Sequence, residues 1–147
     1  TAEVLSSAAH KVNAMVHDGG TYACIEGPQF STRAESNVYR RWDIDIIGMT
    51  NATEAKLARE ASICYATLAL ITDYDCWKEE EEPVTVEAVL EIMHKNVEIA
   101  QKVLKELTSE FNGKRRCDCS LASKYAIVTD SKNIPAQLKD ELSILFG

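Results

Sequence analysis

Residues 64–77 read Cys64-Tyr-Ala-Thr-Leu-Ala-Leu-Ile-Thr-Asp-Tyr-Asp-Cys-Trp77, an apolar run that ends in two carboxylates. The apolar part, from Cys64 to Thr72, is typical of a strand that is covered on both faces. Asp73 and Asp75 follow its C-terminal end. In an extended chain their side chains point the same way, with Cα atoms about 7 Å apart. Because open α/β sheets bind ligands at the carboxyl ends of their strands, this pair predicts a binding site.

The sequence before this stretch predicts an alternation of helices and strands. The expected elements are a helix over 4–16, a strand over 21–26, a helix over 33–42, a strand over 44–49 and a helix over 54–62. Residues 44–72 then form a strand, a helix and a strand, which implies a parallel pair and a right-handed crossover. Thr32 and Glu35 have capping-box spacing, and Asp43 is expected in a left-handed turn.

An amphipathic stripe follows, with Thr85 as the expected helix cap and Asn112-Gly113 as the end of the helix. Two short elements are expected over 120–128 and 134–145, the second of them helical. The run of four glutamates from Glu79 to Glu82 is typical of a solvated loop. Together these patterns predict an α/β fold, with a sheet flanked by helices.

The composition is that of a globular protein, with 147 residues, 46% hydrophobic and 27% charged. This length fits one domain or part of a larger one. A net charge of -7 argues against a nucleic-acid partner, which needs clustered Lys and Arg. No apolar stretch approaches the length of a membrane helix. The chain begins at Thr1 in a stretch predicted to be helical, so we expect it to be part of a longer protein.

The five cysteines predict reduced thiols and a cytoplasmic protein, because their number is odd and two lie in apolar runs. Cys117-Asp-Cys119 resembles half of a metal site. Paired zinc ligands are usually separated by two or more residues, and no second pair of Cys or His lies nearby in the sequence. We therefore expect no metal site.

Three loops are predicted to converge at strand ends, namely Phe30-Ser31, Met49-Thr50 and Asp73–Asp75. An aromatic face, a hydroxyl group at a helix N-terminus and two acceptors suit a small polar aromatic ligand. Thr50 lies where backbone N–H groups and the helix dipole favour an anion such as phosphate. The sequence thus predicts a small-molecule site at one edge of the sheet.

Several segments resemble the S-methyl-5'-thioadenosine phosphorylases of the trimeric purine nucleoside phosphorylase family. They are Gly27-Pro-Gln-Phe-Ser-Thr-Arg-Ala-Glu-Ser36, Gly48-Met-Thr50, Leu57-Ala-Arg-Glu60 and Thr72-Asp-Tyr-Asp-Cys-Trp77. The resemblance covers about residues 19–107. It implies a single α/β domain around a mixed, partly barrel-like sheet, of which residues 1–147 are the C-terminal part. The domain would then be incomplete, without the half that supplies most phosphate contacts.

The resemblance also implies the reaction and the roles of individual residues. Phosphate would cleave methylthioadenosine to adenine and methylthioribose 1-phosphate in a homotrimer, with no cofactor and no metal. The implied roles are purine packing by Phe30, ribose binding by the backbone of Met49, phosphate binding by Thr50, adenine recognition by Asp73 and Asp75, the methylthio pocket at Val89 and Leu90, and substrate preference at Ser31 and Val86.

The chemistry of N-glycosidic cleavage favours a catalytic acid at Asp73. Negative charge builds on the departing purine, and a carboxylic acid near N7 donates a proton to it if burial raises its pKa. An Asp also accepts from the 6-amino group of adenine, whereas relatives that use 6-oxopurines commonly carry Asn. Two alternatives stay open: a broader or 6-oxopurine phosphorylase, and a truncated chain that only binds purines or associates with full-length subunits.

Overall fold

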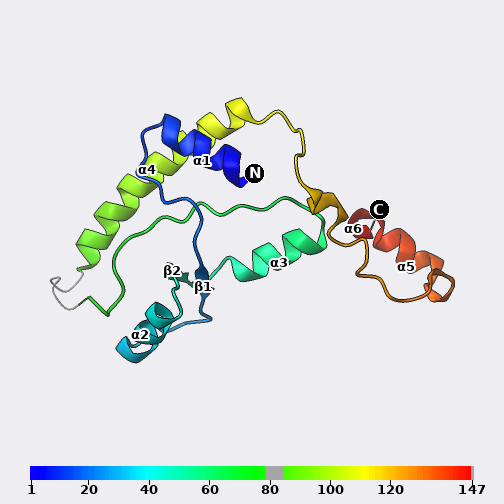
Figure 1. The fold of residues 1–147 in the computed structure, drawn as a ribbon, viewed down its shortest axis with the longest axis horizontal. Helices are drawn as coiled ribbons and strands as arrows, with labels where there is room; N and C mark the ends of the chain where they lie inside the picture. The colour runs from blue at the N-terminus through cyan, green and yellow to red at the C-terminus, as the bar shows by residue number, and fades with distance from the viewer. Residues whose placement is uncertain (79–84, 147) are drawn as a thin grey trace.

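Figure 1 shows a computed structural model of the chain, which describes residues 1–78 and 85–146. The predicted glutamate loop lies outside this range, and of Val86 only the backbone is described. The elements in chain order are α1 (Ala2–Lys11), β1 (Tyr22–Cys24), α2 (Arg33–Arg41), β2 (Ile46–Gly48), α3 (Ala52–Glu60), α4 (Val86–Glu110), η1 (Asp118–Leu121), η2 (Ser131–Asn133), α5 (Ala136–Glu141) and α6 (Ser143–Phe146).

β1 and β2 form a two-stranded parallel sheet, with Tyr22 opposite Ile46 and Cys24 opposite Gly48. Helix α2 makes the crossover between them. The Asp45 carboxylate fixes the start of the pair by accepting a 2.6 Å hydrogen bond from the backbone N–H of Thr21. Both strands therefore end at the same edge, which places the loops that follow them next to each other.

The predicted strand over 64–72 is wrong. This segment takes an extended path from α3 toward α4 (Figure 1), but it belongs to no strand. A strand exists only where a neighbour pairs with its backbone, and within residues 1–78 and 85–146 the sheet holds only β1 and β2. The parallel pair is consequently β1–β2, not the predicted pair of 44–49 with 64–72.

The core lies where α1 packs on α4, as seen at the top of Figure 1. Its buried members are Leu5, Ala8, Ala9 and Val103. Small alanines on α1 let the two helices approach closely. Lys11 forms an ion pair with Glu110 at the edge of this contact. Leu68 of the extended segment packs against the same core.

The predicted helix caps are present. Thr32 and Glu35 form the capping box of α2, with a 2.7 Å hydrogen bond from the Thr32 N–H to the Glu35 carboxylate. Asp43 has φ 54°, the left-handed turn expected of it. Thr85 caps α4 by accepting from the Ala88 N–H at 3.2 Å. Local sequence therefore determines where these helices begin.

Some expected elements differ from the structure in their extent or number. α1 ends at Lys11 rather than near residue 16, because Asn13 turns the chain with φ 57°. The C-terminal region holds four short helical elements (η1, η2, α5 and α6) instead of two. None of the helices within the described ranges is long and apolar enough to span a membrane.

Candidate functional site

The loops after β1 and β2 are joined side by side. The Cys24 thiol donates to the carbonyl oxygen of Thr50 at 3.0 Å, and the Ile25 N–H donates to the Gly48 carbonyl at 2.8 Å. Gly27 has φ 66°, and a Cβ atom there would lie 2.7 Å from the Met49 sulfur. The contact between these loops therefore depends on a glycine at position 27.

The third loop docks on the first. The Cys76 thiol lies 3.5 Å from the carbonyl oxygen of Ser31. The Arg40 guanidinium of α2 lies over the Trp77 ring, 3.9 Å from its centroid, in a cation–π contact. Partial desolvation of the exposed Cys76 thiol, together with the negative charge of Asp75, raises its pKa, so it stays protonated. The structure thus brings the three predicted loops together.

Asp73 and Asp75 lie in the irregular stretch just before the turn at Cys76–Trp77, rather than at the end of a paired strand. Asp73 is exposed and accepts from the Thr72 hydroxyl at 2.7 Å. The half-buried Asp75 accepts from the Cys76 N–H at 2.8 Å, and its carbonyl accepts from the Lys78 N–H at 3.2 Å. The strand that was expected to align the two carboxylates is absent, so their common orientation stays a prediction.

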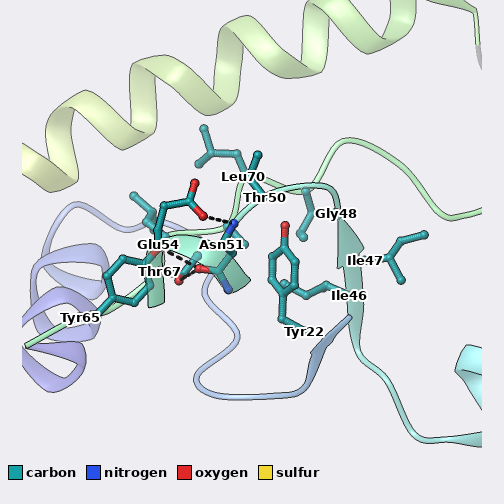
Figure 2. Close-up of a pocket in the computed structure, with 13 residues that line it drawn as sticks. Tyr22, Ile46, Ile47, Gly48, Thr50, Asn51, Glu54, Tyr65, Thr67 and Leu70 are labelled. Carbon is teal, nitrogen blue, oxygen red and sulfur yellow. Dashed lines mark hydrogen bonds between the residues drawn. The ribbon is translucent and has the colours of Figure 1, made fainter. Parts of the chain in front are cut away.

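A cavity of about 350 Å³ lies between β2, the start of α3 and the extended segment (Figure 2). Of the predicted site residues it includes Thr50. Its lining comprises Tyr22, Ile46, Ile47, Gly48, Thr50, Asn51, Glu54, Tyr65, Thr67, Leu68, Ala69, Leu70 and Ile71. The Tyr22 ring stands beside Gly48, where an added Cβ would overlap the tyrosine hydroxyl. The cavity places the predicted phosphate residue in a space that is large enough for a small ligand.

Asn51 is the polar centre of this cavity; the sequence predicts it, or Thr53, only as a helix cap, and it is the N-cap of α3. Its side-chain oxygen accepts hydrogen bonds from the Tyr65 hydroxyl, at 2.9 Å, and from the Thr67 hydroxyl. Its backbone N–H donates to the Glu54 carboxylate at 2.8 Å. Tyr65 and Thr67 are two residues apart and share one side of an extended chain, but their spacing does not identify Asn51 as their partner.

The other predicted site residues lie around these loops. Phe30, whose side chain is 84% exposed, and Ser31 line a smaller cavity of about 100 Å³. Val89, half-buried, and Leu90, 47% exposed, lie in the first turn of α4. Neither cavity includes Met49, Asp73, Asp75, Val89 or Leu90 among its lining residues. The side chain of Val86 is outside the described part.

Comparison with known proteins assigns the chain to a family. The family model described as Phosphorylase superfamily matches residues 2–109. The chain belongs to the phosphorylase superfamily. The match contains all three loops and both strands of the sheet, and it confirms the resemblance seen in the sequence.

The most informative relatives bear one name. The S-methyl-5'-thioadenosine phosphorylase of Geobacter sulfurreducens is 50% identical over 143 residues, which are 97% of this chain and 50% of that protein. That of Koribacter versatilis is 47% identical over 146 residues, or 99% of this chain and 50% of that protein. The chain therefore spans about half the length of these curated relatives.

Solved structures agree with this assignment. A methylthioadenosine phosphorylase from an antarctic soil metagenomic library superposes with a TM-score of 0.87 at 43% identity, covering 99% of this chain and 52% of that one. The methylthioadenosine phosphorylase of Schistosoma mansoni, in complex with adenine, superposes with a TM-score of 0.69 at 34% identity, covering 84% of this chain and 49% of that one. The phosphorylase fold predicted from the sequence is thus confirmed, and this chain accounts for about half of it.

Proposed function

We propose that this chain carries the base-recognition part of an S-methyl-5'-thioadenosine phosphorylase. Phosphate attacks the anomeric carbon of the nucleoside, the bond from that carbon to the purine breaks, and adenine and methylthioribose 1-phosphate form. The observation that carries the proposal is the joining of the three loops by the Cys24–Thr50 and Cys76–Ser31 contacts. Those loops hold the residues that match the family's substrate motifs.

Phosphate binds beside Thr50 in the larger cavity. The Thr50 hydroxyl lies just before α3, where helix N–H groups and the helix dipole favour an anion. The Glu54 carboxylate already accepts from the Asn51 N–H. We infer that Thr50 makes only part of the phosphate site. Groups outside this chain would supply the remaining positive electrostatic potential that a phosphate anion needs.

The purine lies against Phe30, with Asp73 near its leaving nitrogen and Asp75 toward its amino group. The exposed face of Phe30 offers a surface on which a flat base stacks. A carboxylic acid at Asp73 stabilises the charge that develops on adenine by donating a proton. The ribose is held by the backbone of Met49, which lies between the purine loop and Thr50.

Substrate preference comes from the first turn of α4 and from Ser31. Val89 and Leu90 present apolar surface near the start of α4, which favours a methylthio group over a hydroxyl. Ser31 and Val86 complete this selection. The aspartates argue for a 6-aminopurine, since an acceptor pairs with an amino group and not with a carbonyl oxygen.

The exposure of Asp73 and Phe30 in this chain is the reason to expect a larger assembly. A carboxylic acid that protonates a leaving group is usually shielded from water, and Asp73 is exposed here. The chain spans half of its relatives. We infer that further polypeptide, from the same subunit and from neighbours in a cytoplasmic homotrimer, covers the site.

The test measures phosphate-dependent release of adenine from methylthioadenosine. One sample is the 147-residue chain, and a second is a chimera in which residues 1–147 replace the matching half of the Geobacter sulfurreducens relative, called the chimera below. We expect activity in the chimera, dependent on phosphate, with methylthioadenosine preferred over inosine. The unaltered relative serves as the positive control.

Two results would overturn the proposal. A folded chimera that binds adenine but releases none would favour a non-catalytic purine-binding chain. A chimera that prefers inosine would favour a 6-oxopurine phosphorylase. Equilibrium dialysis with adenine and circular dichroism separate these outcomes from misfolding.

A further inference from the structure

Three cysteine side chains meet at the end of α3 that is remote from the proposed phosphate site. Cys64 follows that helix, Cys117 precedes η1, and Cys119 lies within η1. Their sulfur atoms all lie within 4.8 Å of one another, and the Cys64 and Cys117 sulfurs are 3.4 Å apart. Residues 53 positions apart therefore form one cluster, which explains why the sequence alone showed only the Cys117-Asp-Cys119 half.

Hydrogen bonds on both sides of the cluster hold the two segments together. The Ser123 hydroxyl donates to the Glu60 carbonyl at 2.7 Å. The Arg115 guanidinium donates to the Ser62 carbonyl at 3.3 Å, and the Ser62 and Ser123 hydroxyls are 3.4 Å apart. Arg115 and Ser123 lie on either side of Cys117 and Cys119 in the sequence. Their hydrogen bonds therefore hold the thiols close together independently of any interaction between the sulfur atoms.

The thiols differ in exposure. Cys64 and Cys119 are half-buried, whereas Cys117 is exposed. The cluster thus combines one accessible sulfur with two shielded ones.

We propose that Cys64, Cys117 and Cys119 form a binding site for a thiophilic cation, with Zn²⁺ as the expected ion. Thiolates select soft or borderline ions such as Zn²⁺ and Cu⁺. Zn–S bonds of about 2.3 Å at tetrahedral angles place sulfurs about 3.8 Å apart. The Cys64–Cys117 separation of 3.4 Å is close to this value, and all three sulfurs lie within 4.8 Å of one another. Three protein ligands leave a fourth position on the exposed side of Cys117 for water.

A disulfide accounts for the cluster less well. It would join two sulfurs at about 2.05 Å and leave the third without a role, whereas a cation uses all three. The bound ion would fasten the η1 segment to the end of α3. This is a structural role that does not depend on the proposed phosphorolysis, since the cluster shares no residue with the loops described above.

The test uses the reduced 147-residue chain in the absence of oxygen, with Co²⁺ as a spectroscopic probe and Zn²⁺ in competition with a chromophoric chelator. We expect one ion per chain, thiolate-to-cobalt charge-transfer absorption and tetrahedral d–d bands. Each of Cys64→Ser, Cys117→Ser and Cys119→Ser should weaken binding about tenfold or more, because each removes one of three ligands. Cys24→Ser and Cys76→Ser, which remove thiols elsewhere, should leave the affinity unchanged.

A second measurement needs no substitution and is therefore insensitive to misfolding of a variant. Zn²⁺ should protect Cys64, Cys117 and Cys119 of the unaltered chain from alkylation and leave Cys24 reactive. Equal protection of all five cysteines, or none, would overturn the site. So would a reduced chain that binds no Zn²⁺ but forms a Cys64–Cys117 disulfide in air, detected by mass spectrometry as the loss of two hydrogens.

Discussion

The Tyr65 hydroxyl donates a 2.9 Å hydrogen bond to the side-chain oxygen of Asn51. This bond joins the extended segment that leads to Asp73 with the residue that caps α3, next to Thr50 (Figure 2). The proposed base loop and the proposed phosphate loop are therefore linked through one amide side chain. A displacement of Asn51 should therefore change the geometry of both loops.

Asn51→Ala should destabilise the chain by roughly 2–3 kcal/mol. It removes the acceptor for Tyr65 and Thr67, each bond worth about 0.5–1.5 kcal/mol, and it forces an alanine to φ 91°. Asn51→Gly loses the same bonds without the backbone strain, so it should cost less. Urea unfolding of both variants measures the difference. Equal costs would show that the backbone conformation carries no strain.

The α1–α4 contact should depend on Val103. Its side chain is 1% exposed, and Val103→Ala removes two methyl groups from the core. At about 0.8 kcal/mol per methyl group, plus a cavity term, the loss should reach roughly 2 kcal/mol. Val97→Ala, at a position 42% exposed on the same helix, is the matched control and should cost well under half of that. A similar loss in both variants would contradict burial of the Val103 side chain as the cause, because Ala has the higher helix propensity at either position.

The sequence predicted what depends on neighbours along the chain. The capping box of Thr32 and Glu35, the Thr85 cap and the left-handed Asp43 are set within a few residues, and all are present. The loops after β1 and β2 were also placed correctly, because parallel strands end at one edge. The strand over 64–72 failed because pairing needs a partner that pattern alone cannot supply.

Contacts between distant residues explain the remaining differences. The pattern of residues over Tyr65–Leu68 indicates an extended chain, in which alternate side chains lie on the same side. It does not say that Tyr65 meets Asn51 while Leu68 packs on α1 and α4. Likewise, nothing near Cys117 in the sequence points to Cys64. Both relationships are set by packing between segments.

Gly48→Ala should disrupt the parallel pair. An added Cβ would overlap the Tyr22 hydroxyl and lie 2.9 Å from its ring carbon Cζ, so the ring must move. Overpacking of this kind typically costs about 1–3 kcal/mol. Tyr22→Leu removes the obstructing atoms. Adding Gly48→Ala to the Tyr22→Leu variant should therefore cost much less unfolding free energy than adding it to the unaltered chain. A double-mutant cycle on unfolding free energies tests this, and additive costs would contradict the steric explanation.

The start of α2 should lose stability in acid. Hydrogen bonds from the Thr32 backbone N–H and then its hydroxyl lower the pKa of Glu35 below its ordinary value of 4.5. The carboxylate therefore stabilises the folded chain fully above about pH 4.5, and this contribution is lost as the pH falls through the lowered pKa. Glu35→Gln should abolish that part of the pH dependence. NMR titration of the Glu35 side chain checks the direction, and an unshifted midpoint would contradict it.

Asp73→Asn should change which base the chimera cleaves. An amide can donate to a 6-oxopurine, and it cannot supply the proton that a carboxylic acid gives to departing adenine. Loss of one buried partner costs about 1–3 kcal/mol, so kcat/KM for methylthioadenosine should fall by roughly tenfold to a hundredfold relative to that for inosine. Asp140→Asn, an exposed aspartate on α5, is the matched control and should leave the ratio unchanged. An unchanged ratio in Asp73→Asn would remove this residue from base recognition, because its carboxylate would then distinguish neither the amino group nor the leaving nitrogen.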